Sequence, residues 1–146
     1  MDAKASIDAL TRDFFNLFTS GQDGKADLSA ITRLFIPEGL IVKSVGEVTQ
    51  AYTLAQFVEP REKLLNDGTL LEFREEEISE RTEIAGNIAQ RLSVYKKSGI
   101  LAGEHFESQG VKTLQFVKTP EGWRLSALAW DDERPGFSVL EWNRDR

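Results

Sequence analysis

The chain has 146 residues, of which 40% are hydrophobic and 29% are charged, a composition typical of globular proteins rather than of disordered or fibrous ones. Because this length suits one hydrophobic core, we expect a single domain over residues 1–146. The formal net charge of -6 argues against a nucleic-acid partner, since binding to phosphates draws on clustered lysine and arginine.

The residue types that are missing narrow the chemistry further. The sequence contains no cysteine, which excludes disulfides, thiolate metal ligands and a cysteine nucleophile. Its first residues carry charges at short intervals, and no segment approaches the roughly 20 apolar residues that a membrane span needs. We therefore expect a cytoplasmic protein with no membrane partner, no metal and no cofactor.

Two helices are predicted in the first third of the chain. The first helix is predicted by apolar residues at steps of three and four, which is the spacing of one helix face. These residues are Ile7, Leu10, Phe14, Leu17 and Phe18. Gly21 is a typical helix stop, and a polar turn follows at 22–25. The spacing recurs over residues 28–35 and predicts a second, shorter helix, because Pro37 excludes helix from the residue before it.

A strand and a third helix come next. The apolar run 40–42 contains two β-branched residues and predicts a strand that ends in a turn around Gly46. Thr53 and Gln56 have the spacing of a capping box, in which each side chain satisfies a free amide at the start of a helix. Pro60 removes an amide inside this third helix, so we expect a kink or a restart there.

From residue 70 onward the sequence favours β-structure. Strands are predicted at 70–82, 84–97, 103–119 and 123–132. The expected turns contain Gly86 or Asn87, then Ser98 and Gly99, and finally residues 120–122. Charges of mixed sign between residues 72 and 83 predict a solvated face of the sheet rather than a metal site. Helices followed by long antiparallel strands place the chain in the α+β class.

Two strings of residues resemble a known family. Residues 34–42 read LFIPEGLIV and residues 116–125 read FVKTPEGWRL. In order and spacing they resemble the second helix with the first strand, and the last hairpin, of the NTF2-like superfamily, which includes SnoaL-like cyclases and ketosteroid isomerases. The resemblance covers nearly the whole chain. It implies a cone of three N-terminal helices packed on a strongly curved, mixed, largely antiparallel β-sheet, with a pocket of mixed polarity at its open end.

The chain departs from the ketosteroid isomerases at two positions that matter for their reaction. The aspartate that serves as their base aligns with Lys43, and a cationic lysine cannot take the role of that carboxylate. The tyrosine expected on the first helix has no counterpart, since Phe14, Phe15 and Phe18 occupy that stretch. The resemblance therefore implies the fold without this reaction, and the fold hosts both enzymes and binding modules.

His105 is the only histidine and the distinctive candidate for acid/base chemistry. Strand alternation places it on one face with Glu107, and a carboxylate beside an imidazole can orient and charge it. Asp131, at the expected pocket mouth, is a further catalytic candidate. A surface histidine and acids that simply face water explain the same pattern, so both interpretations stay open.

The last predicted strand presents two faces. Alternation places Ala127 and Ala129 on the face that packs on the helices, where their small side chains leave room for a ligand. The opposite face carries Leu128 and Trp130. Because members of the resembled superfamily commonly dimerise through the outer sheet face, these two residues predict a homodimer interface.

Aromatic residues are the expected walls of the pocket. The residues expected to contact the ligand there are Phe14 and Phe18 on the first helix, Tyr52 before the third helix and Phe57 on it. Arg91 and Tyr95 share a face of their strand, and the sequence leaves open whether that face meets the pocket or the outside.

Two functional hypotheses follow. In the first, the pocket binds a small, mostly apolar molecule that carries a few polar groups. In the second, the protein is a cofactor-independent isomerase, cyclase or dehydratase that uses His105 with Glu107 or Asp131 as an acid/base pair.

Overall fold

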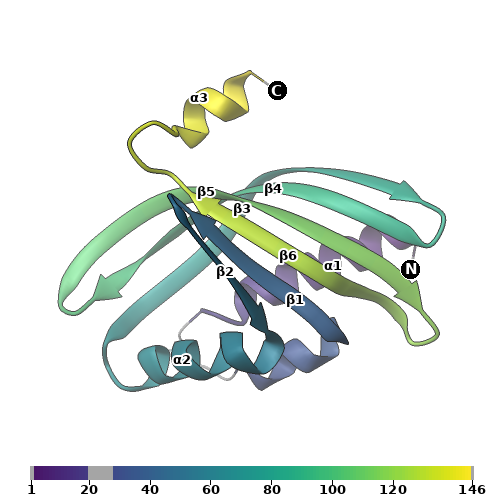
Figure 1. The fold of residues 1–146 in the computed structure, drawn as a ribbon, viewed down its shortest axis with the longest axis horizontal. Coiled ribbons are helices and arrows are strands. Elements are labelled where there is room, and N and C mark those ends of the chain that lie inside the picture. The colour runs from purple at the N-terminus through teal and green to yellow at the C-terminus, as the bar shows by residue number, and fades with distance from the viewer. Residues whose placement is uncertain (1, 20–27, 146) are drawn as a thin grey trace.

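The computed structural model describes residues 2–19 and 28–145. Within them the elements follow in the order α1 (Ala3–Asn16), η1 (Ser29–Arg33), β1 (Phe35–Val45), β2 (Val48–Thr53), α2 (Leu54–Asn66), β3 (Leu70–Ala85), β4 (Ile88–Leu101), β5 (Glu104–Thr119), β6 (Gly122–Asp132) and α3 (Val139–Arg144) (Figure 1). The α+β class is confirmed. None of the described helices is long and apolar enough to cross a membrane.

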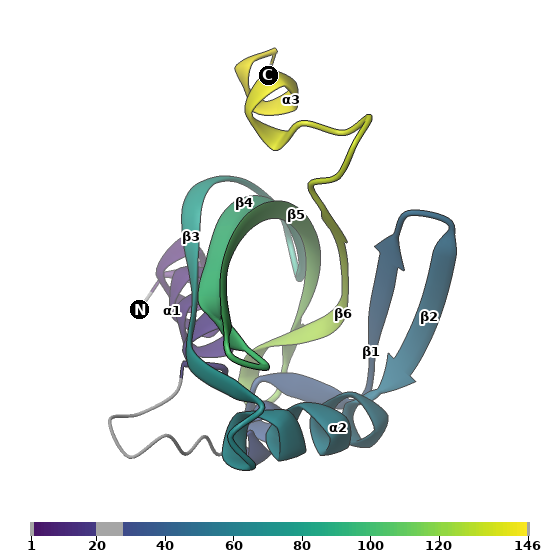
Figure 2. The same ribbon diagram turned by 90° about the vertical axis from the view of Figure 1, so that its left-hand side faces the viewer.

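One six-stranded sheet dominates the fold. Its order is β2-β1-β6-β5-β4-β3, and every neighbouring pair is antiparallel except β1 and β6, which run parallel. The sheet is mixed and strongly curved, so that β3, β4 and β5 curl over like part of a barrel (Figure 2). The helix α1 contacts β3 and β6, while α2 crosses the lower end against β1, β2 and β3.

The two long helices form where the apolar spacing predicts them. In α1, the side chain of Asp2 caps the helix by accepting a hydrogen bond of 2.7 Å from the amide of Ala5. In α2 the predicted capping box between Thr53 and Gln56 is present, with bonds of 3.0 and 3.2 Å. Pro60 lies inside α2 without a restart of the helix. The predicted stop at Gly21 and the turn at 22–25 lie outside the described residues.

The prediction of three N-terminal helices is wrong. Only a five-residue 3-10 helix, η1, forms where the second helix was expected. The reason is tertiary, because Phe35 already pairs with Leu125 of β6 and therefore belongs to β1. The 11-residue β1 extends the strand predicted at 40–42. Two further elements were not predicted from the sequence, namely β2, whose residues are mostly exposed, and the short C-terminal α3.

One predicted turn is also misplaced. Residues Ser98 and Gly99 lie inside β4, and the chain turns instead at Ala102 and Gly103, which have φ angles of +50° and +86°. Gly99 serves close packing, since a Cβ there would lie 3.1 Å from the ring of Phe106 and 3.2 Å from the main-chain oxygen of Leu71. The turns around Gly86 and at residues 120–122 fall where the sequence predicts them.

A β-bulge in β6 decides which side chains face the helices. Gln115 of β5 pairs with Ala127 and the next residue, Phe116, pairs with Leu125, so Ser126 is one residue too many. Such an insertion shifts the alternation of side chains by one. As a result, Leu125 and Leu128 both lie in the hydrophobic core, at 0% and 2% exposure.

Candidate functional site

A cavity of about 610 Å³ lies between α2 and the concave face of the sheet. Its walls are rich in aromatic rings, among them Phe14, Phe18, Tyr52, Phe57, Tyr95 and Trp130. Several rings meet edge to face, for example Phe57 with Phe18 and with Trp130, each at 5.9 Å between centroids. This volume and this lining are typical of small-molecule sites.

The four aromatic residues predicted as pocket walls all line this cavity. Phe14 and Phe18 come from the helix α1 or its end, Tyr52 from β2, and Phe57 from α2. Their placement is as expected from the sequence, and their contact with a ligand stays a prediction.

The four predictions on β6 are wrong about its faces. Ala127 and Ala129 are absent from the cavity wall, whereas Leu128 and Trp130 line it. The bulge at Ser126 is the cause, because strict alternation from Trp123 puts each later residue on the opposite face. Leu128 and Trp130 therefore cannot form an interface on the outer face of the sheet.

The same shift exchanges the two aspartates at the end of β6. Asp131 makes an ion pair with Arg134 and does not line the cavity. Asp132 lines the cavity in its place and accepts hydrogen bonds from Tyr95 Oη at 2.6 Å and from Lys97 Nζ at 2.9 Å. Asp131 is thus not at the pocket mouth, and Asp132 is the carboxylate that sequence reasoning missed by one position.

His105 and Glu107 do not belong to the cavity. Both side chains are exposed, and it is Phe106 between them that lines the cavity wall. The position of these two residues therefore gives no support to an acid/base pair inside the cone. They do share one face of β5, as alternation predicts.

Arg91 and Tyr95 lie on the concave side of the sheet and are buried, at 5% and 0% exposure. Arg91 joins α1 to the sheet, since its guanidinium donates to Asp8 at 2.6 Å and to Glu77 through Nε at 3.1 Å. Burial lowers the pKa of Arg91, but the hydrogen bonds that it donates to Glu77 and Asp8 outweigh this effect and leave the pKa raised. Arg91 therefore acts as a charged clamp that holds α1 against β3 and β4.

Tyr95 and Asp132 form the polar end of the cavity together with Lys97. Burial raises the pKa of Tyr95, and the charges of Asp132 and Glu75 raise it further, so the phenol stays protonated and donates. Burial also opposes ionisation of Asp132, but the charge of Lys97 and the bonds from Tyr95 and Lys97 leave its pKa below the usual value. Asp132 is therefore an anion at neutral pH.

Lys112 and Glu75 form a second polar pair in the cavity wall. Their Nζ and Oε1 atoms are 2.6 Å apart, and the ammonium lies 3.8 Å from the centre of the Tyr95 ring. Burial lowers the pKa of Lys112, opposed by the charge of Glu75. Glu75 lies in the charged run that was predicted to be solvated, and that prediction is wrong here, because Glu75 falls on the inward face of β3 and is buried.

Arg61 and Lys43 complete the charged lining. The guanidinium of Arg61 lies over the ring of Phe57, 3.8 Å from its centre, and 5.3 and 5.5 Å from the centres of Tyr52 and Trp130. Lys43 is on β1, directly beside Trp130 in the parallel pairing with β6. Across residues 2–19 and 28–145, no three histidine, aspartate or glutamate side chains gather as a metal site would require.

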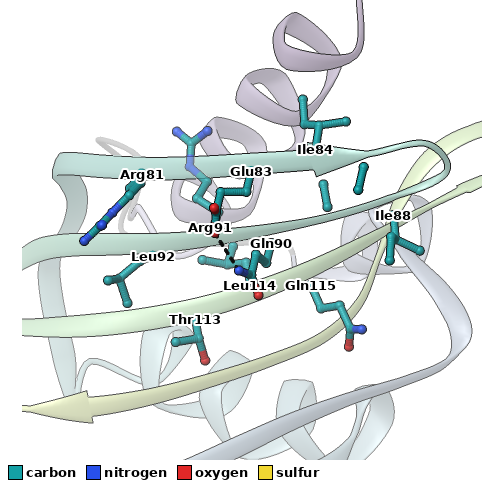
Figure 3. A pocket seen from close by; sticks show the side chains of 12 residues that line it. Arg81, Glu83, Ile84, Ile88, Gln90, Arg91, Leu92, Thr113, Leu114 and Gln115 are labelled. Carbon is teal, nitrogen blue, oxygen red and sulfur yellow. Dashed lines mark hydrogen bonds between the residues drawn. The ribbon is translucent and has the colours of Figure 1, made fainter.

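A second hollow, of about 820 Å³, lies over β3, β4 and β5 (Figure 3). It is lined by a mixture of apolar and polar side chains, with Gln90 donating to Glu83 at 2.7 Å. It holds no aromatic ring among its lining residues. The cone cavity is the stronger candidate site because aromatic walls and buried polar groups converge there.

Comparison with known proteins connects this architecture to solved structures. No protein-family model matches the sequence, and no curated protein matches it closely enough to count as a relative. An NTF2-like protein of unknown function from Prochlorococcus superposes with a TM-score of 0.73 at 15% identity, covering 97% of this chain and 99% of that one.

Two further structures give the same picture. An NTF2-like superfamily protein from Salmonella enterica has a TM-score of 0.70 at 14% identity and covers 90% of this chain and 92% of its own. An NTF2-like protein from Novosphingobium aromaticivorans has a TM-score of 0.68 at 18% identity, and the match covers 97% of this chain and 87% of that one. At such identities the likeness concerns the fold, and this chain has the fold of the NTF2-like proteins.

Proposed function

We propose that the protein binds a small, mostly apolar molecule in the cone cavity. The observation that carries this proposal is the meeting of aromatic walls with a few buried polar groups in one cavity of about 610 Å³. Aromatic rings bury a large apolar area of a ligand, and the polar groups fix its orientation. The similarity of the fold to NTF2-like proteins supports a pocket at this end of the cone, but it does not identify a ligand.

Binding without catalysis fits the polar groups better than acid/base chemistry. The Asp132 carboxylate already accepts bonds from Tyr95 and Lys97, and Glu75 is paired with Lys112. A general base needs a free carboxylate or imidazole within reach of the substrate. His105 is exposed outside the cavity, so the isomerase, cyclase or dehydratase hypothesis loses the residue on which it was built.

A screen of small metabolites for thermal stabilisation tests the proposal, because a molecule that binds only the folded state raises the melting temperature. A matched pair of variants locates the binding site. Leu64 lines the cavity and is 38% exposed, whereas Leu71 is 39% exposed and lies outside it. Leu64→Glu should abolish the stabilisation and Leu71→Glu should preserve it. Stabilisation that survives Leu64→Glu would place the ligand elsewhere.

We also propose that the outer sheet face forms a homodimer, through other residues than those first predicted. Ile88 lies at the hollow over β3, β4 and β5 and is 56% exposed. Exposed apolar residues beside a hollow favour association. Sedimentation at micromolar concentration should show a dimer that Ile88→Lys dissociates. A monomeric wild-type protein would end this proposal without affecting the first.

A further inference from the structure

The charges that line the cone cavity do not balance. Four cationic side chains line it, namely Lys43, Arg61, Lys97 and Lys112, against the two carboxylates of Glu75 and Asp132. This excess of positive charge stands in a chain with a net charge of -6. An acidic protein thus presents a locally positive cavity.

Both carboxylates are already engaged. Lys112 pairs with Glu75 at 2.6 Å, and Lys97 pairs with Asp132 at 2.9 Å. No ion pair to a carboxylate from the described residues involves Arg61 or Lys43. These two cations are therefore the ones whose charge the protein leaves for another partner.

Arg61 and Lys43 both line the cavity beside Trp130. Lys43 on β1 is the pairing partner of Trp130 on β6, and the guanidinium carbon of Arg61 approaches the Trp130 ring centre to 5.5 Å from α2. Arg61 donates to the main-chain oxygen of Phe57 at 3.2 Å and stacks over its ring. The stacking fixes the plane of the guanidinium and leaves further N–H groups of its fork for an acceptor.

A half-buried guanidinium that makes no ion pair is costly. Burial lowers the pKa of Arg61, and the neighbouring Tyr52 and the charge of Glu75 offset this only in part. A carboxylate suits this site because guanidinium and carboxylate match in plane and bind through two parallel hydrogen bonds. A flat ring suits the walls, since Trp130, Phe57 and Tyr52 offer faces and edges within reach of the same guanidinium.

We propose that the ligand is an aromatic carboxylate, whose carboxylate is bound by Arg61 with Lys43 while its ring packs against Trp130 in the cavity. This inference rests on the function proposed above and names the chemical class of the ligand. Lys112 and Lys97 remain with their own carboxylates and shape the far end of the cavity.

Isothermal titration with two matched probes tests the charge requirement. The probes are 2-naphthoate and the uncharged 2-naphthamide, which has the same ring and nearly the same shape. Naphthoate should bind about tenfold or more tightly than the amide, because hydrogen bonds to charged groups contribute that much. Arg61→Met should reduce this preference to about twofold or less, and Arg61→Lys should keep part of it because the charge remains without the fork.

A control variant separates a local effect from a general one. Lys96 is exposed and paired with Glu76 at 3.2 Å outside the cavity, so Lys96→Met removes the same charge as Lys43→Met without touching the site. Lys43→Met should weaken naphthoate binding and Lys96→Met should not. Circular dichroism checks that each variant is folded. If Arg61→Met does not fold, the comparison of Lys43→Met with Lys96→Met still tests the inference.

Each outcome assigns failure to one proposal. Equal affinity for naphthoate and naphthamide would overturn the carboxylate inference and leave the binding function standing. The inference would also fail if neither probe bound while neutral molecules stabilised the protein and Leu64→Glu abolished that stabilisation. No binding of the probes and no stabilising metabolite would remove the binding function itself.

Discussion

Lys112 and Glu75 form an ion pair of 2.6 Å in which the two side chains are only 6% and 8% exposed. The pair joins β5 to β3 across the concave face of the sheet, since Lys112 lies on β5 and Glu75 on β3. Too little water reaches either charge to stabilise it without its partner. Replacing one of the two residues alone should therefore destabilise the protein more than replacing both.

The first prediction concerns this pair. Lys112→Met should cost about 3–5 kcal/mol of the free energy of unfolding, because it leaves the Glu75 carboxylate buried without its partner. The double variant Lys112→Met with Glu75→Leu should recover most of that loss. Urea unfolding measures both.

The exposed pair of Lys96 and Glu76 is the control, with side chains 47% and 41% exposed. Lys96→Met should change stability by less than about 1 kcal/mol, as surface ion pairs do. A loss in Lys112→Met no larger than in the control would contradict the burial of the cavity pair.

The second prediction concerns Gly110, beneath the Tyr95 hydroxyl. A Cβ at Gly110 would lie 2.6 Å from Tyr95 Oη and 2.8 Å from the main-chain oxygen of Asp131. Gly110→Ala should therefore displace Tyr95, break its bond to Asp132 and cost about 1–3 kcal/mol of stability. Tyr95→Phe removes the same bond without the clash. Since both changes act on one contact, the double variant should cost clearly less than the sum, and strict additivity would speak against the contact.

The third prediction concerns stability in acid. The folded-state pKa of Asp132 lies below its usual value, so its contribution to stability is present above the unfolded pKa of about 3.9 and is lost as the pH falls through the folded pKa. Asp132→Asn should reduce the loss of stability below about pH 4. If Asp132→Asn loses as much stability in acid as the unchanged protein does, Asp132 does not gain its charge partners on folding.

The fourth prediction tests the bulge in β6. Leu128→Ala should cost about 2–5 kcal/mol because Leu128 is 2% exposed in the core. Ala129→Lys should cost less than about 1 kcal/mol, since a lysine can reach solvent from the convex face. Urea unfolding measures both costs. A larger cost for Ala129→Lys than for Leu128→Ala would contradict the bulge and support the strict alternation expected from the sequence.

Local patterns in the sequence were sufficient for the two long helices and for the long strands. The capping box at Thr53 and the apolar spacing that includes Phe14 depend on nearest neighbours along one helix, and both hold. The order of the strings around Pro37 and Pro120 also led to the correct fold. The helix expected at 28–35 failed because the pairing of Phe35 with Leu125, a partner 90 residues away, overrides local preference.

The candidate site was harder to predict because its residues depend on small shifts of register. One bulged residue, Ser126, exchanged Asp131 for Asp132 and the alanines for Leu128 and Trp130. Nothing in the local pattern marks that bulge. The inward side of β3 had one signal in the sequence, because Phe73 is apolar and Glu75 follows it at the spacing of one strand face, and both line the cavity.

Fluorine NMR of protein labelled with 5-fluorotryptophan tests the cavity as the binding site most directly. Trp130 lines the cavity, while Trp142 lies in α3 outside the sheet and serves as an internal reference. Variants with phenylalanine at either position assign the signals. Titration with 2-naphthoate, or with any molecule that stabilises the protein, should shift the Trp130 signal and leave that of Trp142 in place. A ligand that binds without moving the Trp130 signal would contradict the site proposed for the cone.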